Sequence, residues 1–530
     1  MKNLNKYLLV LMVTVFGVSC TDDFLDTEPK TTLTDDSFYQ TKEHAELAIV
    51  GCYDGVQQLY ASGVAFPILS EVLSDNCFGG TGKDDAYNYR VLDEFDLSVS
   101  PGEVNVLNGN WVAYYKAIYR INVLLQKMDQ INWEGDETYR NHIEAQARFL
   151  RAYCYFDMVR IWEKVPLVTE PTTDNVPQAE VDDIYIQITQ DLLFTVENGS
   201  ETIEPGRVNK WVAKAYLARV FLFYTGYYGS SDLVGLVSKA EALQGLEDVI
   251  GRGAYDLIEE FKNLWPAASS VPDGEGLSTT YAGKDNAETV FAIKYNITSD
   301  YDGGNTDGNH WLVLLGFRGQ TFSPYGTGWG ACTVNPDLYA VYSAEDTRKE
   351  ASIISIDGEG LDYDNASHRE YTGYTGKKYI PLANPDGSDV AVANGGFDFQ
   401  IGQYQDYVVM RYADVLLMAA ELGSANAQSY FDEVRGRAGL TSLPATFHNI
   451  MKERRLEFAL EGIRYWDLLR QGVNVAAEAI AVDTKVMNAG EEADKSILGV
   501  NVLKTRGFQM IPQNHVTRSS GVLIQNAGWE

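Results

Sequence analysis

The segment that decides the fold is ERRLEFALEGIRYWDLLR, residues 453–470 of a chain of 530 residues. Its apolar residues recur at helical spacing: Leu456, Leu460, Ile463 and then Trp466 or Leu469. This spacing predicts one helix from about residue 450 to 470 with an apolar stripe along it. Glu461–Arg464 and Asp467–Arg470 lie three residues apart, where opposite charges attract by a few tenths of a kcal/mol if exposed. We therefore expect a structural element, whose charges tie helices together or cap backbone groups, and not a catalytic one.

The same periodicity occurs in several segments before this one, and the last of the ranges below includes it. They cover residues 41–60, 111–131, 138–162, 184–196, 211–228, 237–250, 410–423, 425–439 and 447–469. Thr41 is the expected N-cap of the first helix. Ala213, Ala215 and Ala218 have the spacing that allows helices to stack closely, and the run from Trp211 resembles a degenerate tetratricopeptide repeat. The sequence thus predicts a mainly α fold of paired helices, with an ordinary helical bundle as the alternative.

Helical periodicity disappears between residues 266 and 405, where Gly, Asp, Asn, Tyr and Trp become frequent. Turn-forming residues at this density predict long ordered loops with a few short strands. Such loops on a rigid helical frame are where binding residues concentrate. Beyond Gln471 the remaining chain shows no clear pattern, and we expect it to be irregular.

Aromatic residues on loops are the candidate ligand-binding residues, because aromatic rings offer large contact areas that stack on the C–H faces of sugars. Three clusters stand out, and in the third the glycines that flank Tyr325 and Trp329 are expected to leave both rings accessible. Their candidate residues are Tyr87, Asn88, Tyr89 and Arg90; Tyr301 and Trp311; Tyr325 and Trp329. The alternative is that these rings anchor their own loops. Aromatics at helical spacing belong to the core on this interpretation: Tyr115, Tyr119, Tyr153, Tyr155, Phe156 and Trp211.

Composition excludes several classes of function. The formal net charge of −32 opposes binding of nucleic acid and of anionic sugars. The six histidines include no HExxH motif and no close pair, so no zinc site is expected. Acidic loops at residues 300–307 and 357–364 could supply oxygen ligands to calcium, but the first lacks the order of an EF-hand, and we expect both to be solvated turns. Four cysteines lie far apart and are expected as buried free thiols: Cys52, Cys77, Cys154 and Cys332.

The N-terminus carries an export signal. Lys2 and Lys6 precede an apolar stretch, 7–18, which is too short to span a bilayer, and the segment ends at Gly17-Val18-Ser19-Cys20. This ending resembles the lipobox of bacterial lipoproteins, although Gly17 replaces the usual bulky aliphatic residue. We expect Cys20 to be lipidated after removal of residues 1–19, and acyl chains to hold the protein on a membrane. An ordinary signal peptide that contains a cysteine is the alternative.

Several motifs, in order along the chain, resemble the SusD/RagB family of Bacteroidetes outer-membrane lipoproteins. They are the opening segment Glu453–Arg470, the preceding Met410–Glu421, Arg151–Arg160 with Val165-Pro-Leu-Val, and Phe508-Gln-Met-Ile-Pro512. The last departs from the family's Phe-Pro-Ile-Pro, since Gln509 replaces a proline. The resemblance covers the expected mature chain apart from the loop region.

This resemblance implies a tetratricopeptide-like helical scaffold with a large loop-rich insertion. The expected divisions are a signal peptide (1–19), a tether (20–36), an N-terminal helical region (37–265), the insertion with the ligand-binding residues (266–405), and the C-terminal helices and tail (406–530). The acidic residues after Cys20 resemble those of lipoproteins delivered to the outer face of the outer membrane.

The function that the resemblance implies is capture of an oligosaccharide or polysaccharide and its delivery to a SusC-like TonB-dependent transporter. Such proteins are binding proteins, so no enzyme activity, cofactor or metal is expected. Uptake of a peptide or glycopeptide by the same architecture is the alternative. A glycoside hydrolase is a more distant one, because acidic residues are too plentiful here for the sequence to nominate a catalytic pair.

Overall fold

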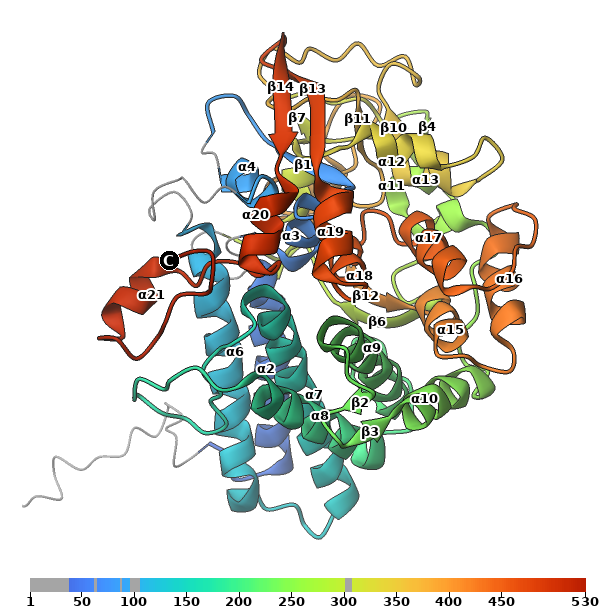
Figure 1. The fold of residues 1–530 in the computed structure, drawn as a ribbon. Coiled ribbons are helices and arrows are strands. Elements are labelled where there is room, and N and C mark those ends of the chain that lie inside the picture. Colours follow the sequence, from blue (N-terminus) through green and yellow to red (C-terminus); the bar gives the residue numbers. More distant parts are fainter. Residues whose placement is uncertain (1–37, 62–63, 86–87, 96–104, 301–306) are drawn as a thin grey trace, which may run out of the picture.

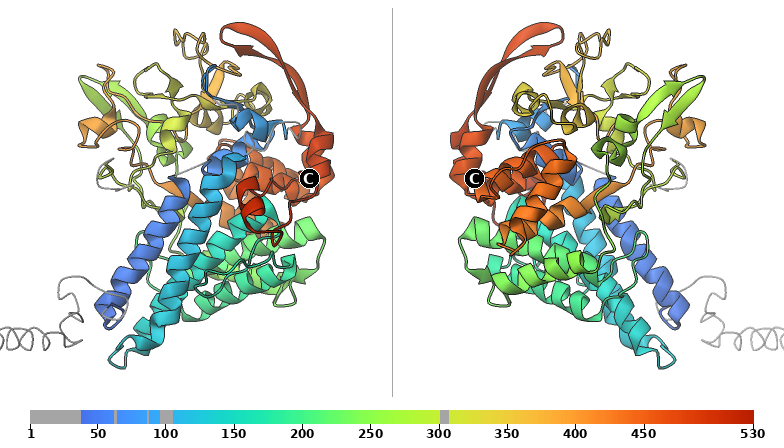
Figure 2. Two further views of the ribbon diagram at one scale, coloured as in Figure 1. Left: turned by 90° about the vertical axis from the view of Figure 1, so that its left-hand side faces the viewer. Right: turned by 90° about the vertical axis from the view of Figure 1, so that its right-hand side faces the viewer.

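A computed structural model describes residues 38–61, 64–85, 88–95, 105–300 and 307–530. Its lower half is a stack of long helices, and strands and loops gather above them (Figures 1 and 2). The helices before residue 265 are α2 (Lys42–Gln57), α3 (Phe66–Val72), α4 (Asn88–Asp93), α6 (Asn108–Lys127), α7 (Glu137–Trp162), α8 (Val181–Asn198), α9 (Lys210–Tyr228) and α10 (Lys239–Gly251).

Sequence neighbours pack side by side in this stack. α2 lies against α6, α6 against α7, and the series continues through α8 and α9 to α10. The Thr41 side chain accepts a hydrogen bond from the backbone N–H of His44, so Thr41 is the N-cap predicted for α2. Asn209 caps α9 in the same way. The expected mainly helical scaffold with paired helices is confirmed.

Short strands and helices fill the region between residues 265 and 405. The helices are α11 (Pro266–Ser269), α12 (Pro336–Val341), α13 (Arg348–Ser352) and α14 (Val390–Ala393). The strands are β4 (Ser270–Asp273), β5 (Gly276–Thr279), β6 (Thr289–Ile293), β7 (Phe317–Arg318), β8 (Thr327–Gly328), β9 (Ala331–Val334), β10 (Ile353–Ser355) and β11 (Tyr374–Gly376). One 3₁₀ turn, η6 (Leu312–Leu315), lies in this region. The others precede it: η2 (Gln58–Tyr60), η3 (Asn105–Leu107), η4 (Met128–Gln130) and η5 (Phe261–Leu264).

Two-stranded sheets attach this region to the rest of the chain. β1 (Cys77–Gly80) pairs antiparallel with β9, Cys77 opposite Val334. β12 (Tyr407–Arg411) pairs antiparallel with β6, Tyr407 opposite Ile293. The remaining pairs join neighbours in sequence, among them β2 (Asp232–Leu233) with β3 (Val237–Ser238).

The C-terminal part returns to helices. They are α15 (Tyr412–Glu421), α16 (Ala427–Arg437), α17 (Phe447–Glu457), α18 (Arg464–Leu469), α19 (Val473–Ile480), α20 (Gly499–Thr505) and α21 (Gln513–Arg518). The expectation of an irregular tail after Gln471 is wrong. Besides three of these helices, the tail contains a hairpin of β13 (Val482–Asn488) and β14 (Glu491–Ile497), whose turn has positive φ at Ala489 and Gly490.

The single helix expected from residue 450 to 470 is also wrong. α17 ends at Glu457, and Leu460 and Gly462 have φ angles of 65° and 80° before α18 begins. A Cβ at Gly462 would lie 2.6 Å from the Cα of Pro67, so the chain must turn here, and with glycine, to pack against α3. The expected Glu461–Arg464 pair is absent, because Arg464 binds Asp75 instead. The Asp467–Arg470 pair is present at 2.8 Å.

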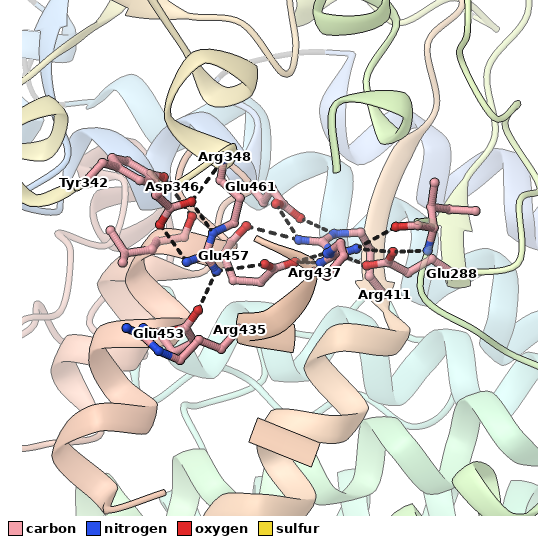
Figure 3. Close-up of polar contacts among 12 residues, drawn as sticks. Glu288, Tyr342, Asp346, Arg348, Arg411, Arg435, Arg437, Glu453, Glu457 and Glu461 are labelled. Carbon is pink, nitrogen blue, oxygen red and sulfur yellow. Dashed lines mark hydrogen bonds and ion pairs between the residues drawn. The ribbon is translucent and has the colours of Figure 1, made fainter. Parts of the chain in front are cut away.

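The charges of this segment do tie elements together, as expected, but they do so in the interior (Figure 3). Glu457 of α17 binds Arg411 of β12, Arg348 of α13 and Arg437 of α16. Glu461 binds Arg411 and the buried Lys378. Arg411 also reaches Glu288, next to β6. Each carboxylate thus faces several cations, which offsets the cost of its burial and joins the loop region to the C-terminal helices.

The four described cysteines are buried free thiols, as expected. One large apolar core runs from α2 through the C-terminal helices, and a smaller one lies under the loops, around Phe317 and Tyr325. Tyr119 departs from the expected core set, since 55% of it is exposed on α6.

Candidate functional site

Among the candidate aromatic residues that the structure describes, Trp329 is the most exposed, and it lies in the turn between β8 and β9. The residue is 39% exposed. Its backbone N–H donates to the carbonyl oxygen of Val313 at 2.9 Å, and the N–H of Gly330 donates to that of Gly316, also at 2.9 Å. β8 runs parallel to β7 beside this turn. The indole is therefore presented on a backbone that its neighbours fix on both sides.

The two flanking glycines have different reasons to be there. A Cβ at Gly328 would lie 2.2 Å from the carbonyl oxygen of Val313. Gly330 has a φ of 71°, and a Cβ there would lie 2.7 Å from Nε2 of His368. Both positions need glycine so that the turn can approach its supports closely. Neighbouring glycines predicted accessible rings at Trp329 and Tyr325, and of these two only the ring of Trp329 is exposed.

His368 holds the turn from beneath. Its Nε2 lies 2.8 Å from the carbonyl oxygen of Gly330, and its Nδ1 lies 2.8 Å from the hydroxyl of Tyr363. Since a carbonyl only accepts, Nε2 carries the proton and Nδ1 accepts from Tyr363. Burial lowers the pKa of His368 to about 4, so the ring is neutral at pH 7. A neutral, buried histidine thus fixes the residue after Trp329.

The N-terminal loop that contains the first cluster lies beside this turn. The N–H of Thr81 donates to the same Gly330 carbonyl at 2.8 Å. Arg318 of β7 forms an ion pair with Asp85 at 3.0 Å, and Arg369 donates to the carbonyl oxygen of Asp85 at 2.7 Å. The structure therefore brings the first and third aromatic clusters together, although more than 230 residues separate them in sequence.

The one described ring of the first cluster, that of Tyr89, is only partly accessible. Tyr89 is half-buried against the main core, and burial raises the pKa of its hydroxyl. Arg90 donates from Nε to Glu94 at 2.8 Å. Asn88 begins α4. Tyr87 lies outside the described residues, as does Tyr301 of the second cluster.

Two further candidates are corrected by the structure. Trp311 is only 2% exposed, and its ring packs against those of Tyr379 and Tyr407. Tyr325 is 7% exposed, and its hydroxyl donates to Glu359 at 2.7 Å. Both rings anchor their loops, the alternative that the sequence left open, and neither is accessible to a ligand.

Sequence reasoning missed the polar residues of this surface. Arg318 and Asp85 carry opposite charges beside the Trp329 turn, and both are partly exposed. Asp85 lies two residues before Tyr87 of the first cluster, but the search for aromatic residues did not single it out. Nothing in the sequence pointed to His368, because its role comes from a contact 38 residues away.

Carboxylates gather at one further place, behind α4. Among the described residues, Asp93, Glu94 and Glu370 place ligand atoms within 4.8 Å of one another. Lys495 of β14 occupies the middle of this group. Its ammonium lies 2.8 Å from both oxygens of Asp93 and 2.7 Å from Glu370. The protein's own cation thus neutralises this cluster, which is distinct from the acidic loops considered in the sequence.

None of the helices described by the structure is long and apolar enough to cross a membrane.

Two family models match the chain in sequence. The model described as "SusD family" matches residues 355–529, and the model described as "Starch-binding associating with outer membrane" matches residues 23–222. A SusD-like protein of Bacteroides ovatus is 26% identical, over 88% of this chain and 82% of its own. The SusD-like protein P2 of Formosa agariphila is 25% identical, over 89% and 91%.

Solved structures of SusD-like proteins also match the chain. A laminarin binding SusD-like protein, 28% identical, superposes with a TM-score of 0.72 over 92% of this chain and 99% of its own. Surface glycan-binding protein A from Bacteroides thetaiotaomicron, in complex with laminarihexaose, is 23% identical and has a TM-score of 0.73 over 92% and 100%. This second likeness concerns the fold.

Proposed function

Since the chain belongs to the SusD/RagB family, we propose that it is a cell-surface lipoprotein that binds a neutral glycan at the Trp329 turn and delivers it to a TonB-dependent outer-membrane transporter. The observation that carries the binding proposal is the exposed indole of Trp329 on a backbone fixed by His368 and by two close glycines. A rigid aromatic platform loses little conformational entropy when a sugar ring stacks on it.

The groups around the indole suit the hydroxyls of a sugar. Arg318 supplies donors and Asp85 acceptors, and their ion pair leaves both side chains partly exposed. Because the two charges are already paired, this surface favours a neutral ligand over a strongly charged one. The net charge of −32 acts in the same direction by repelling polyanions.

The relatives support a glycan as the ligand. One matched structure is described as laminarin binding, and another was solved with laminarihexaose. Laminarin is therefore the first glycan to test. Trp329 is the principal contact in this proposal, with Arg318 and Asp85 beside it.

The anchor and the partner rest on the family and on the N-terminal sequence. Cys20 lies outside the described residues, and the first described helix, α2, begins at Lys42. Lipid on Cys20 would hold the body at the outer membrane, next to the transporter that receives the glycan. Incorporation of labelled palmitate that is lost in Cys20→Ala tests the anchor. Co-purification of a TonB-dependent transporter with the membrane-bound protein tests the partner.

Affinity electrophoresis tests the binding proposal. The purified protein is run in native gels that contain laminarin, other neutral glycans or no polymer. We expect retardation in at least one glycan gel and a marked weakening of that retardation in Trp329→Ala. Unretarded migration in every glycan gel, together with binding to peptides, would replace the glycan with a peptide as the ligand.

A further inference from the structure

A second aromatic surface lies on α6, away from the Trp329 turn. Trp111, Tyr115 and Tyr119 follow one another at intervals of four residues and therefore share one face of the helix. Trp111 is 4% exposed, and the Tyr115 hydroxyl donates to the carbonyl oxygen of Pro166 at 3.0 Å. Tyr119 continues the same stripe but is 55% exposed. Contacts within the chain thus account for the first two rings and leave the third uncovered.

Tyr119 borders a groove of about 280 Å³ between α6, residues 166–176 and α21. α21 lies alongside α6 in Figure 1. Trp111, Tyr115 and Ile118 contribute the aromatic and apolar part of the lining. None of the residues that line this groove belongs to the Trp329 turn or to the loops that support it. The groove is therefore a separate feature of the molecule.

Polar side chains without partners also line the groove. Glu170 and Asp174 come from the 166–176 segment, and Arg518 comes from α21. All three are exposed, and their side chains make no hydrogen bond or ion pair with another residue in the described parts of the chain. Their donors and acceptors are thus available to a ligand over an aromatic surface, the combination that fixes small polar ligands.

We propose that this groove is a second glycan-binding site, which takes one or two rings of the same neutral glycan as the Trp329 turn. The choice of glycan rests on the proposed function. Tyr119 supplies a ring for a sugar face, while Glu170 and Asp174 accept from hydroxyls and Arg518 donates to them. Because both signs of charge border the groove, it does not favour a ligand that carries a strong net charge of one sign. Its volume of about 280 Å³ is just below the roughly 300–1,000 Å³ typical of small-molecule pockets, which suits a short segment of glycan.

Two sites on one body change how a polymer is held. A long polysaccharide that reaches both sites binds the second one intramolecularly, so its apparent affinity exceeds that of either site alone. A short oligosaccharide occupies each site separately. The second site therefore contributes more to retention of the polymer than to binding of a fragment.

Calorimetric titration with laminarihexaose tests the proposal. The wild-type protein is compared with Trp329→Ala, Tyr119→Ala and the double variant. Phe447→Ala on α17 is the matched control, because Phe447 is 54% exposed and does not line this groove. We expect two equivalents bound by the wild type and by the control, one by each single variant, and none by the double variant. In laminarin gels, Tyr119→Ala should weaken retention roughly tenfold or more.

The outcomes separate the groove from the principal site. One equivalent in the wild type, abolished by Trp329→Ala and unchanged by Tyr119→Ala, would overturn the second site and leave the proposed function intact. No binding of laminarihexaose by the wild type would overturn both sites as laminarin sites. Since Tyr119 is exposed, we expect its variant to keep the wild-type melting temperature, so a loss of the second equivalent reports on binding.

Discussion

At the scale of single residues, exposure separates rings that the sequence treats alike. Trp311, Tyr325 and Trp329 all lie on loops with glycines or polar residues nearby, yet only Trp329 presents its ring. Neighbouring glycines predicted accessible rings at both Tyr325 and Trp329, and this prediction is wrong for Tyr325. The burial of Tyr325 depends on Glu359, 34 residues away, and that of Trp311 on Tyr379 and Tyr407. Contacts between residues far apart in sequence therefore determine the burial of Tyr325 and Trp311.

Trp329→Ala and Trp311→Ala should therefore behave in opposite ways. We expect Trp329→Ala to weaken glycan binding at the turn by at least about tenfold, the range of a lost stacking contact, while the melting temperature stays unchanged. Trp311→Ala should cost about 3–5 kcal/mol of unfolding free energy, because it leaves a cavity in the core. Urea denaturation and titration with laminarihexaose measure the two effects. A large loss of stability in Trp329→Ala would identify its ring as a core anchor.

His368 gives the stability of the protein a pH dependence. Its pKa is lowered to about 4 in the folded chain, against about 6.5 when unfolded, so the unfolded chain takes up the proton more readily. The contribution of neutral His368 is complete above pH 6.5 and declines as the pH falls toward 4, by roughly 3 kcal/mol in all.

Comparison with His368→Gln isolates this effect from that of other titrating groups. The unfolding free energies of the two proteins should converge as the pH is lowered from 7 to 4. Parallel curves over that range would show that His368 is not held neutral in the folded protein.

At the scale of elements, helices with a clear apolar period were predicted to within a few residues, as α7 and α9 show. The failures have identifiable causes. Gly462 breaks the expected helix because α3 lies against it, a contact that the periodicity does not contain. The β13–β14 hairpin was missed because most of its residues are polar and few of them are buried. Its Ala489–Gly490 turn was the available signal.

This hairpin supports the candidate site. Ala489 donates to the carbonyl oxygen of His368 at 2.8 Å, and Asn488 accepts from the N–H of Glu370 at 2.7 Å. Lys495, at the opposite end of β14 from the turn, neutralises Asp93 and Glu370. The C-terminal hairpin thus supports the segment around His368, and His368 in turn supports the Trp329 turn.

Lys495→Met should destabilise the protein by about 3–5 kcal/mol at pH 7, because it leaves buried carboxylates without their cation. The loss should shrink toward pH 5, because burial raises the pKa of Asp93, whose carboxylate can then take up a proton. Lys485→Met on the same hairpin is the control, because Lys485 is 58% exposed and its pairs are on the surface. Thermal unfolding at both pH values measures the difference. Equal effects of the two substitutions would contradict this role of Lys495.

At the scale of the whole molecule, the fold class and the order of regions could be predicted, because several motifs of one family occur in sequence. The partners of their charged residues could not. The charges of 453–470 were expected to tie helices together, and Glu457 and Glu461 do so by binding Arg411, Arg348 and Lys378 in the interior. These cations come from segments 40 to 110 residues away in sequence, which no local pattern reveals.

Arg411→Leu should cost several kcal/mol of unfolding free energy, about 3–5, because Glu288 and two further carboxylates lose a partner in the interior. Arg120→Ala removes an ion pair with Asp54 on the exposed faces of α6 and α2, and should cost about 1 kcal/mol or less. Urea denaturation compares the two variants. Similar small losses would show that the buried network contributes no more than a surface pair.

The central claim is that a glycan is captured on the Trp329 turn, on the loop side of the helical stack. The most direct measurement is a crystal structure of the protein with laminarihexaose. The account predicts a sugar ring stacked on the indole of Trp329, with hydroxyls within hydrogen-bonding distance of Arg318 or Asp85. A well-occupied oligosaccharide bound elsewhere, with the Trp329 ring left uncovered, would contradict it.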